Sequence, residues 1–186
     1  MQAAPMVIDR PADKTRIVVT IRSIIVDKES GSDLEQAAKD AQAQAVLLHE
    51  VVQFPSLSSL RYETTLIEPF DLPFHELVAL LKDHYLKPTR NAKVSTDLGL
   101  VFDQRDGHFL RRVNLGPMDK TQLNTEVLKW PLEDAPDTFA FVNLAYQDTE
   151  ERDFSEGALA AFMSQALEWQ RPEIESLAEE LKEARK

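Results

Sequence analysis

The chain contains no cysteine among its 186 residues, and it has only five glycines. Without cysteine there can be no disulfide, no thiol nucleophile and no thiolate metal site. The glycines are too widely spaced for a Walker loop or a dinucleotide-binding fingerprint, and no Gly-x-Ser-x-Gly nucleophile elbow occurs. The sequence therefore lacks the common signatures of nucleotide binding and of hydrolase catalysis, and we expect no cofactor and assign no catalytic residue.

Basic residues are also scarce, since Lys plus Arg number 21 against 32 for Asp plus Glu, a formal net charge of −11. An acidic chain is poorly suited to nucleic acid or to an anionic membrane, because both are bound through clustered positive charge. It suits a soluble protein, and it permits a protein partner with a basic surface, or a cation. No apolar run approaches the ~20 residues of a membrane span, and the first residues lack the basic and apolar regions of a signal peptide. We expect a cytoplasmic protein that contacts neither membrane nor nucleic acid.

Hydrophobic periodicity predicts one α+β domain over residues 15–186, preceded by a flexible arm over residues 1–14. The predicted strands are Thr15–Val26, Leu57–Glu68, the two arms of a hairpin over Asp97–Leu115, and Thr138–Tyr146, with a further short strand at Val127, Leu128 and Trp130. Helices are predicted from Ser32 to Gln53, from Asp71 to Tyr85, and from a cap at Asp153 or Ser155 towards the C-terminus. Strands and helices do not alternate regularly. This order favours a mostly antiparallel sheet of five to six strands, with helices packed on one face.

The segment Leu57–Glu68 has the cleanest alternation and is predicted to be a central strand. One face carries Leu60, Tyr62, Thr64 and Leu66, and the other carries Arg61, Glu63, Thr65 and Ile67. Asp106-Gly107 marks the predicted hairpin, since this pair can supply the positive φ values of a tight turn. The polar side chains of Arg61, Tyr62 and Glu63 are candidates for lining a pocket between sheet and helices.

The strand around Arg61-Tyr62, followed by Leu66 and the Asp71–Tyr85 helix, resembles the C-terminal part of a sporadically distributed family of uncharacterised prokaryotic proteins. That family has an Arg-Tyr-hydrophobic-Asn strand, and the resemblance covers residues 57–181. Glu63 and Thr64 depart from the pattern, at the hydrophobic and Asn positions. The family has no established activity, so the resemblance implies only an order of elements after the strand: a helix, a hairpin, a strand and a final amphipathic helix.

None of the four histidines completes a recognised metal motif. His49-Glu50 and His75-Glu76 begin like a His-Glu-x-x-His helix, but Gln53 and Ala79 stand where the second histidine is required. We therefore expect no metal site.

Five acids gather between the last strand and the last helix: Asp148, Glu150, Glu151, Asp153 and Glu156. They could bind a cation or a basic partner. We favour the alternative that they are solvated residues stabilised by the positive end of the helix.

Arg111-Arg112, with Arg105 and His108, forms the one basic island. It could bind a phosphate or an acidic partner. The favoured alternative is that these residues point outward from an exposed hairpin and protect its edge from aggregation.

The C-terminal helix has an apolar stripe that continues beyond Pro172, a residue expected to kink or split the helix. The stripe consists of Trp169, Ile174, Leu177 and Leu181, and Glu173 and Glu180 lie beside it. Residues 147–186 carry 11 acids and 5 bases, a net charge of −6. The stripe either packs on the parent sheet, or residues 172–186 extend as an acidic docking or dimerisation helix.

These features favour a non-catalytic acidic binding or accessory protein, of the antitoxin, immunity-protein or complex-subunit kind, that acts through protein–protein contacts. The alternative is a small-ligand-binding protein or enzyme that uses the pocket of Arg61, Tyr62 and Glu63. A homodimer formed through the C-terminal helix is a third hypothesis.

Overall fold

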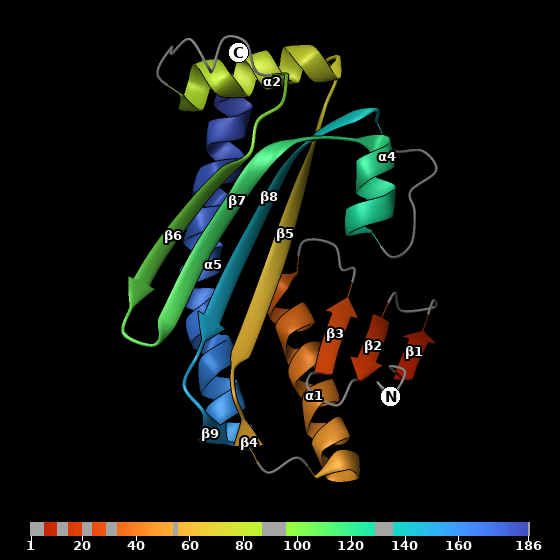
Figure 1. Ribbon diagram of the computed structural model, residues 1–186, viewed down its shortest axis with the longest axis vertical. Helices are drawn as coiled ribbons and strands as arrows, with labels where there is room; N and C mark the ends of the chain where they lie inside the picture. Colours follow the sequence, from red (N-terminus) through yellow and green to blue (C-terminus); the bar gives the residue numbers. More distant parts are fainter. Residues whose placement is uncertain are drawn as a thin grey trace. The chain divides into compact units, whose positions relative to one another are not determined.

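The computed structural model describes residues 6–10, 15–19, 24–28, 33–53, 56–86, 96–128 and 136–185 (Figure 1). The chain divides into two compact units. Unit 1 comprises residues 1–58 and 151–167, and unit 2 comprises residues 59–150 and 168–186. The described residues form an α+β structure in which every strand pairing is antiparallel.

Unit 1 contains a three-stranded sheet in the order β1-β2-β3, formed by β1 (Met6–Arg10), β2 (Thr15–Val19) and β3 (Ile24–Lys28). Residues 6–10, predicted to belong to a loose arm, are therefore a paired strand. The predicted single strand Thr15–Val26 is instead two strands that pair with each other. β-branched residues favour strands at each of these positions but do not determine where one strand ends and the next begins.

Helix α1 (Leu34–Val52) follows and contacts β3. It begins at Asp33, whose side chain accepts a hydrogen bond of 2.9 Å from the backbone N–H of Gln36. The predicted cap, Ser32, lies outside the described residues. Unit 1 also contains a short pairing of β4 (Ser56–Leu57) with β9 (Arg152–Asp153).

Unit 2 is built on a four-stranded sheet in the order β5-β8-β7-β6. Its strands are β5 (Leu60–Phe70), β6 (Leu100–Asp106), β7 (Phe109–Asp119) and β8 (Thr138–Asp148). The prediction of five to six strands in one sheet is wrong, because the N-terminal strands form their own sheet. The predicted central strand, Leu57–Glu68, corresponds mainly to β5 and lies at the end of this strand order. β8 is an interior strand and is buried over most of its length.

Helices α2 (Phe74–Tyr85) and α5 (Glu156–Ala184) supply apolar side chains to the core of unit 2. The buried cluster contains Phe70, Leu77, Leu81, Leu115, Ala140, Val142, Leu144 and Leu181. Trp169, Ile174 and Leu177 pack against it. The C-terminal apolar stripe thus follows the first of its two predicted alternatives and packs on the parent sheet. The helix runs as one element through Pro172 and is not split there.

The connection after β7 differs from the prediction. Lys120–Gln122 form the short helix α4, and Leu123–Val127 form the π-helical turn η2. Val127 therefore lies in a helical turn and not in a strand, while Trp130 is outside the described residues. Leu123, the first residue of η2, is fully buried.

The predicted hairpin is present as β6 and β7, joined by the two residues Gly107 and His108. Gly107 has a φ of 59°, while Asp106 is the last residue of β6. A positive φ at the first loop residue is the geometry that favours glycine in a two-residue hairpin. Across the described parts of the chain, no helix has the length and apolar character needed to cross a membrane.

Candidate functional site

A groove of about 270 Å³ lies in unit 2, where strands β6 and β7 meet helices α2 and α5. Its lining combines three aromatic rings, three aliphatic side chains and four polar or charged ones: Tyr85, Phe102, Trp169, Val113, Leu115, Leu177, Asp103, Gln104, Arg111 and Glu173. This mixture of a largely apolar wall with a few polar groups is typical of a binding site.

The strand register places the groove residues together. Phe102 pairs with Val113, and Gln104 pairs with Arg111, so these four share one face of the β6–β7 hairpin. On α5, Trp169, Glu173 and Leu177 recur at intervals of four and lie along one side of the helix. The groove is therefore formed by strand alternation on β6 and β7 and by four-residue spacing on α5. Neither pattern contains a recognised sequence motif.

Gln170 fixes α5 on the sheet beside the groove, and its side chain is fully buried. Its amide oxygen accepts a hydrogen bond of 2.6 Å from the Thr64 hydroxyl. Its amide nitrogen donates to the carbonyl oxygens of Tyr62, at 3.2 Å, and Leu144, at 3.0 Å. A buried amide is stable when its donors and acceptor are satisfied, as here, and such bonds define the position of a helix more precisely than apolar contacts do.

Arg111 provides positive charge in the groove. Its guanidinium carbon lies 5.9 Å from the centre of the Tyr146 ring, within the range of a cation–π interaction. The Nε atom of Arg111 is buried and has no hydrogen-bond partner among the described residues. Burial raises the pKa of Tyr146, although the neighbouring arginine acts in the opposite direction. Arg111 therefore brings a positively charged group with several N–H donors to the groove.

The groove borders a strand with an unpaired edge. Among the described residues, β6 forms a ladder with β7 and with no other strand. Val101 and Phe102 on β6 have exposed fractions of 61% and 56%. They point to opposite faces of the strand, since successive residues alternate. An edge with exposed apolar side chains is a natural template for another strand.

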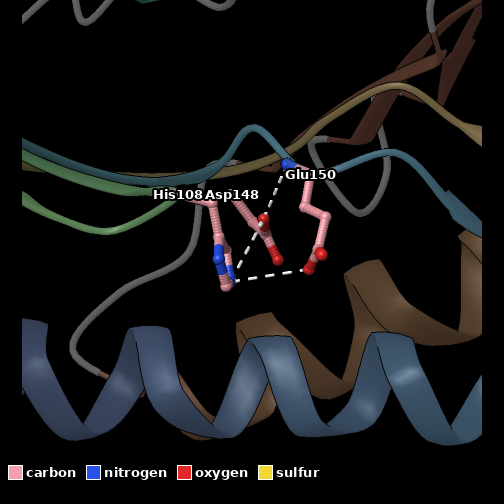
Figure 2. Close-up of side chains that lie close together, drawn as sticks. All are labelled: His108, Asp148 and Glu150. Carbon is pink, nitrogen blue, oxygen red and sulfur yellow. Dashed lines mark hydrogen bonds and ion pairs between the residues drawn. The ribbon is translucent and has the colours of Figure 1, made fainter.

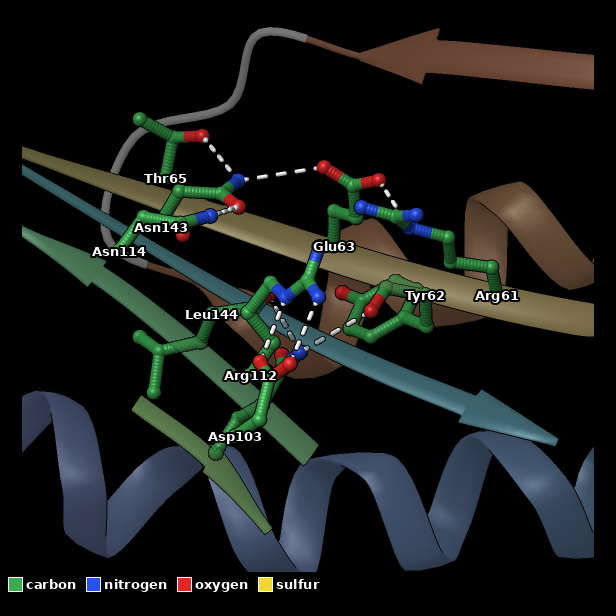
Figure 3. A network of polar contacts seen from close by, with 10 residues as sticks. Arg61, Tyr62, Glu63, Thr65, Asp103, Arg112, Asn114, Asn143 and Leu144 are labelled. Atoms are coloured by element: carbon green, nitrogen blue, oxygen red, sulfur yellow. Dashed lines mark hydrogen bonds and ion pairs between the residues drawn. The ribbon is translucent and has the colours of Figure 1, made fainter. Parts of the chain in front are cut away.

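The three polar residues predicted to line a pocket do not converge. Arg61 and Glu63 form an ion pair on one face of β5 (Figure 3). On that face the Asn143 amide also donates to Glu63, at 3.3 Å, and to Thr65, at 3.2 Å. Tyr62 alternates to the opposite face, where burial raises the pKa of its hydroxyl.

The predicted basic island is likewise divided between the two faces of the sheet. Arg112 makes two hydrogen bonds with Asp103, of 2.6 and 2.7 Å (Figure 3), and these bonds hold the pKa of that carboxyl below its usual value. Arg111 belongs to the groove instead. His108 lies at the turn, near Asp148 and Glu150 of the predicted acid cluster.

The predicted partner-binding residues of α5 have different environments. Leu181 is fully buried, and Ile174 packs against the core. Trp169, Leu177 and Glu173 line the groove as well. Glu180 accepts a hydrogen bond of 3.1 Å from the Tyr85 hydroxyl. Burial, followed by the negative charge of Glu180, raises the pKa of Tyr85 well above its usual range.

Comparisons of the chain with protein-family models, with curated proteins and with solved structures each find no match. The resemblance to the Arg-Tyr strand family stays a prediction from the sequence.

Proposed function

We propose that the chain is a non-catalytic binding protein that captures an extended segment of a partner protein along the free edge of β6. The observation that carries this proposal is the exposed pair Val101 and Phe102 on an edge strand that borders the groove. In strand addition, main-chain hydrogen bonds supply affinity, while alternate side chains of the ligand enter a neighbouring pocket and supply specificity.

The occupant we propose is a segment with alternating apolar residues and at least one basic residue. An apolar side chain of the ligand would cover Phe102 and enter the groove towards Trp169. The basic residue would lie near Glu173, the half-buried carboxylate on the α5 side of the groove. The net charge of −11 favours the approach of such a segment, because long-range attraction raises the association rate of oppositely charged partners.

A display library of extended peptides offers the direct test. We expect the wild-type chain to select peptides with alternating apolar residues and a basic residue. Phe102→Lys should weaken their binding at least about tenfold, because it removes apolar contact and places a positive charge opposite a basic ligand. Hydrogen exchange should show that the β6 amides become protected when the peptide binds.

Val51→Lys is the matched control. Val51 lies on α1 in unit 1 and has an exposed fraction of 82%, so the substitution makes the same change of charge and a similar loss of apolar surface on an element that is not part of unit 2. Selected peptides should bind this variant as they bind the wild type. If peptides bind Phe102→Lys equally well, or if β6 gains no protection, strand addition at β6 is wrong.

The groove itself favours a second candidate, a protein that binds a small ligand. Its volume of about 270 Å³ is just below the range of small-molecule pockets, which span about 300–1,000 Å³, so a ligand would be small. A small ligand would need Arg111 and Trp169 but not the β6 backbone. Binding that is lost in Arg111→Met, with no change in β6 amide exchange in the wild type, would favour this candidate over strand addition.

A further inference from the structure

Three side chains suited to metal coordination meet at the end of unit 2 where the β6–β7 turn lies. They are His108, Asp148 and Glu150, and one ligand atom from each lies within 4.8 Å of the others (Figure 2). The His108 Nε2 atom is 3.8 Å from Asp148 Oδ1 and 3.7 Å from Glu150 Oε2. The residues come from two chain segments that are 40 positions apart, so the cluster is a product of the fold.

We propose that His108, Asp148 and Glu150 form a binding site for a divalent metal ion of the Zn²⁺ type. The site is distinct from the β6 edge and from the groove, so it does not rest on the proposed function. The proposal depends on the ligand chemistry, the backbone that positions the ligands, and the contrast in their burial.

The backbone around His108 is fixed by strand pairing. Phe109, the residue after His108, pairs with Asp148 in the β7–β8 register. Beyond Asp148, the backbone N–H and the hydroxyl of Thr149 both donate to the carbonyl oxygen of His108, at 3.1 and 2.9 Å. These bonds hold the turn next to the end of β8. The imidazole and the two carboxylates therefore approach one another without a flexible linker between them.

The side chains are also oriented. The His108 ring packs against the Phe109 ring with centroids 4.1 Å apart. The Asp148 side chain has an exposed fraction of 1%, and its Oδ1 atom accepts a hydrogen bond of 2.9 Å from the backbone N–H of Glu150. A carboxylate that is buried and hydrogen-bonded in this way is preorganised, and such supporting bonds are what orient metal ligands in proteins.

The spacing and ligand types fit an ion such as Zn²⁺. Ligands about 2.0–2.2 Å from a tetrahedral zinc are separated by about 3.4 Å. The His108 nitrogen is 3.8 and 3.7 Å from the two oxygens, so these two separations need to shorten by a few tenths of an ångström. The separation between the two carboxylates is within 4.8 Å, and it closes as the exposed Glu150 side chain turns towards the ion. A mixed set of imidazole and carboxylates favours Zn²⁺ or Mn²⁺ over Ca²⁺ or Mg²⁺, which prefer oxygen alone.

The cluster has an open side through which an ion could enter. The side chains of His108 and Glu150 have exposed fractions of 42% and 59%, in contrast to Asp148. Three protein ligands leave the fourth tetrahedral position for water, as in zinc sites that keep an open coordination position.

The experiment is a calorimetric titration of the full, tag-free chain with Zn²⁺, followed by the absorption spectrum of the Co²⁺-substituted protein. We expect one equivalent of Zn²⁺ to bind to the wild type. Changes to residues that merely support ligands cost about 10–100-fold in affinity, so loss of a ligand in His108→Ala or Glu150→Gln should weaken binding at least about tenfold. The d–d bands of Co²⁺ should be lost in the same variants.

His75→Ala is the matched control. The His75 Nε2 atom lies 3.9 Å from Glu76 Oε1, and its side chain has an exposed fraction of 82%. It is thus an exposed histidine next to one carboxylate, and its removal should leave Zn²⁺ affinity unchanged. Circular dichroism would confirm that each variant folds, and His108 and Glu150 are exposed enough for their substitutions to be tolerated. The proposal is overturned if the wild type shows no saturable Zn²⁺ binding, or if His108→Ala and Glu150→Gln bind like the wild type.

Discussion

Replacing Gln170 by leucine tests whether the hydrogen bonds of one buried amide hold helix α5 on the sheet. Leucine is apolar and close in size to glutamine, so the substitution leaves no large cavity while it removes three hydrogen bonds. The substitution leaves the hydroxyl of Thr64 and the carbonyl oxygens of Tyr62 and Leu144 without their partner on the helix. We expect the free energy of unfolding of unit 2 to fall.

The magnitude follows from the number of bonds. A typical hydrogen bond contributes about 0.5–1.5 kcal/mol net, so three contribute about 1.5–4.5 kcal/mol. The greater apolarity of leucine offsets part of this loss, and we expect a net destabilisation of about 1–3 kcal/mol. A double-mutant cycle with Thr64→Val should give a coupling energy of about 1 kcal/mol for the bond between Thr64 and Gln170.

Urea unfolding followed by tryptophan fluorescence is a suitable assay, because Trp169 is adjacent to Gln170 and packs on the core of unit 2. Glu168→Ala is the control, since Glu168 is exposed on the same helix and its loss should change stability by less than about 0.5 kcal/mol. An unchanged or increased stability in Gln170→Leu would refute the reasoning. A coupling energy near zero would show that the short bond to Thr64 adds nothing to the pair.

Two further predictions concern packing and pH. A Cβ atom on Gly116 would lie 2.6 Å from the carbonyl oxygen of Leu98, so Gly116→Ala should lower the free energy of unfolding by about 1–3 kcal/mol in a denaturation assay. Gly99→Ala has open space and should change it by less than about 0.5 kcal/mol; equal effects at both positions would contradict the close approach. The pKa of every one of the three tyrosines is raised, chiefly by burial. The folded pKa of each tyrosine thus exceeds the ordinary value of 10.0. The contribution of the tyrosines to the free energy of unfolding is therefore fully present below pH 10.0 and is lost as the pH rises above it. Ultraviolet titration should detect tyrosinate at higher pH in the native than in the urea-unfolded chain, and Tyr85→Phe should reduce the alkaline loss of stability; coincident titration curves would argue against this.

Much of the local structure follows from the sequence alone. The alternation of Leu100 and Phe102 before Gly107, and of Phe109 and Arg111 after it, is enough to predict the β6–β7 hairpin, because a two-residue turn closes a contact between near neighbours. The apolar spacing of α2 and α5 likewise predicts amphipathic helices. The absence of cysteine excludes thiol chemistry whatever the fold.

The sequence fails where contacts join distant segments. It predicts one large sheet, although residues 6–10, 15–19 and 24–28 form a sheet of their own, because alternation shows that a strand forms but not which strand it pairs with. It also predicts β5 to be central, although β8 and β7 hold the two interior positions of this sheet. Gln170 could not be identified as an anchor, since a glutamine on a helix is usually exposed.

The candidate sites show the same division. The sequence separates His108, assigned to a basic island, from Asp148 and Glu150, assigned to a solvated acid cluster, and it expects no metal. The β7–β8 register brings one ligand atom from each of these residues within 4.8 Å of the others. The placement of Arg61 and Tyr62 on opposite faces of β5, by contrast, already follows from the alternation of the strand. The sequence by itself thus determines the elements and the chemical groups that each carries, since these depend on interactions between near neighbours. Only the tertiary structure decides which groups meet, because strand pairing and helix packing depend on the free energy of burying the whole core.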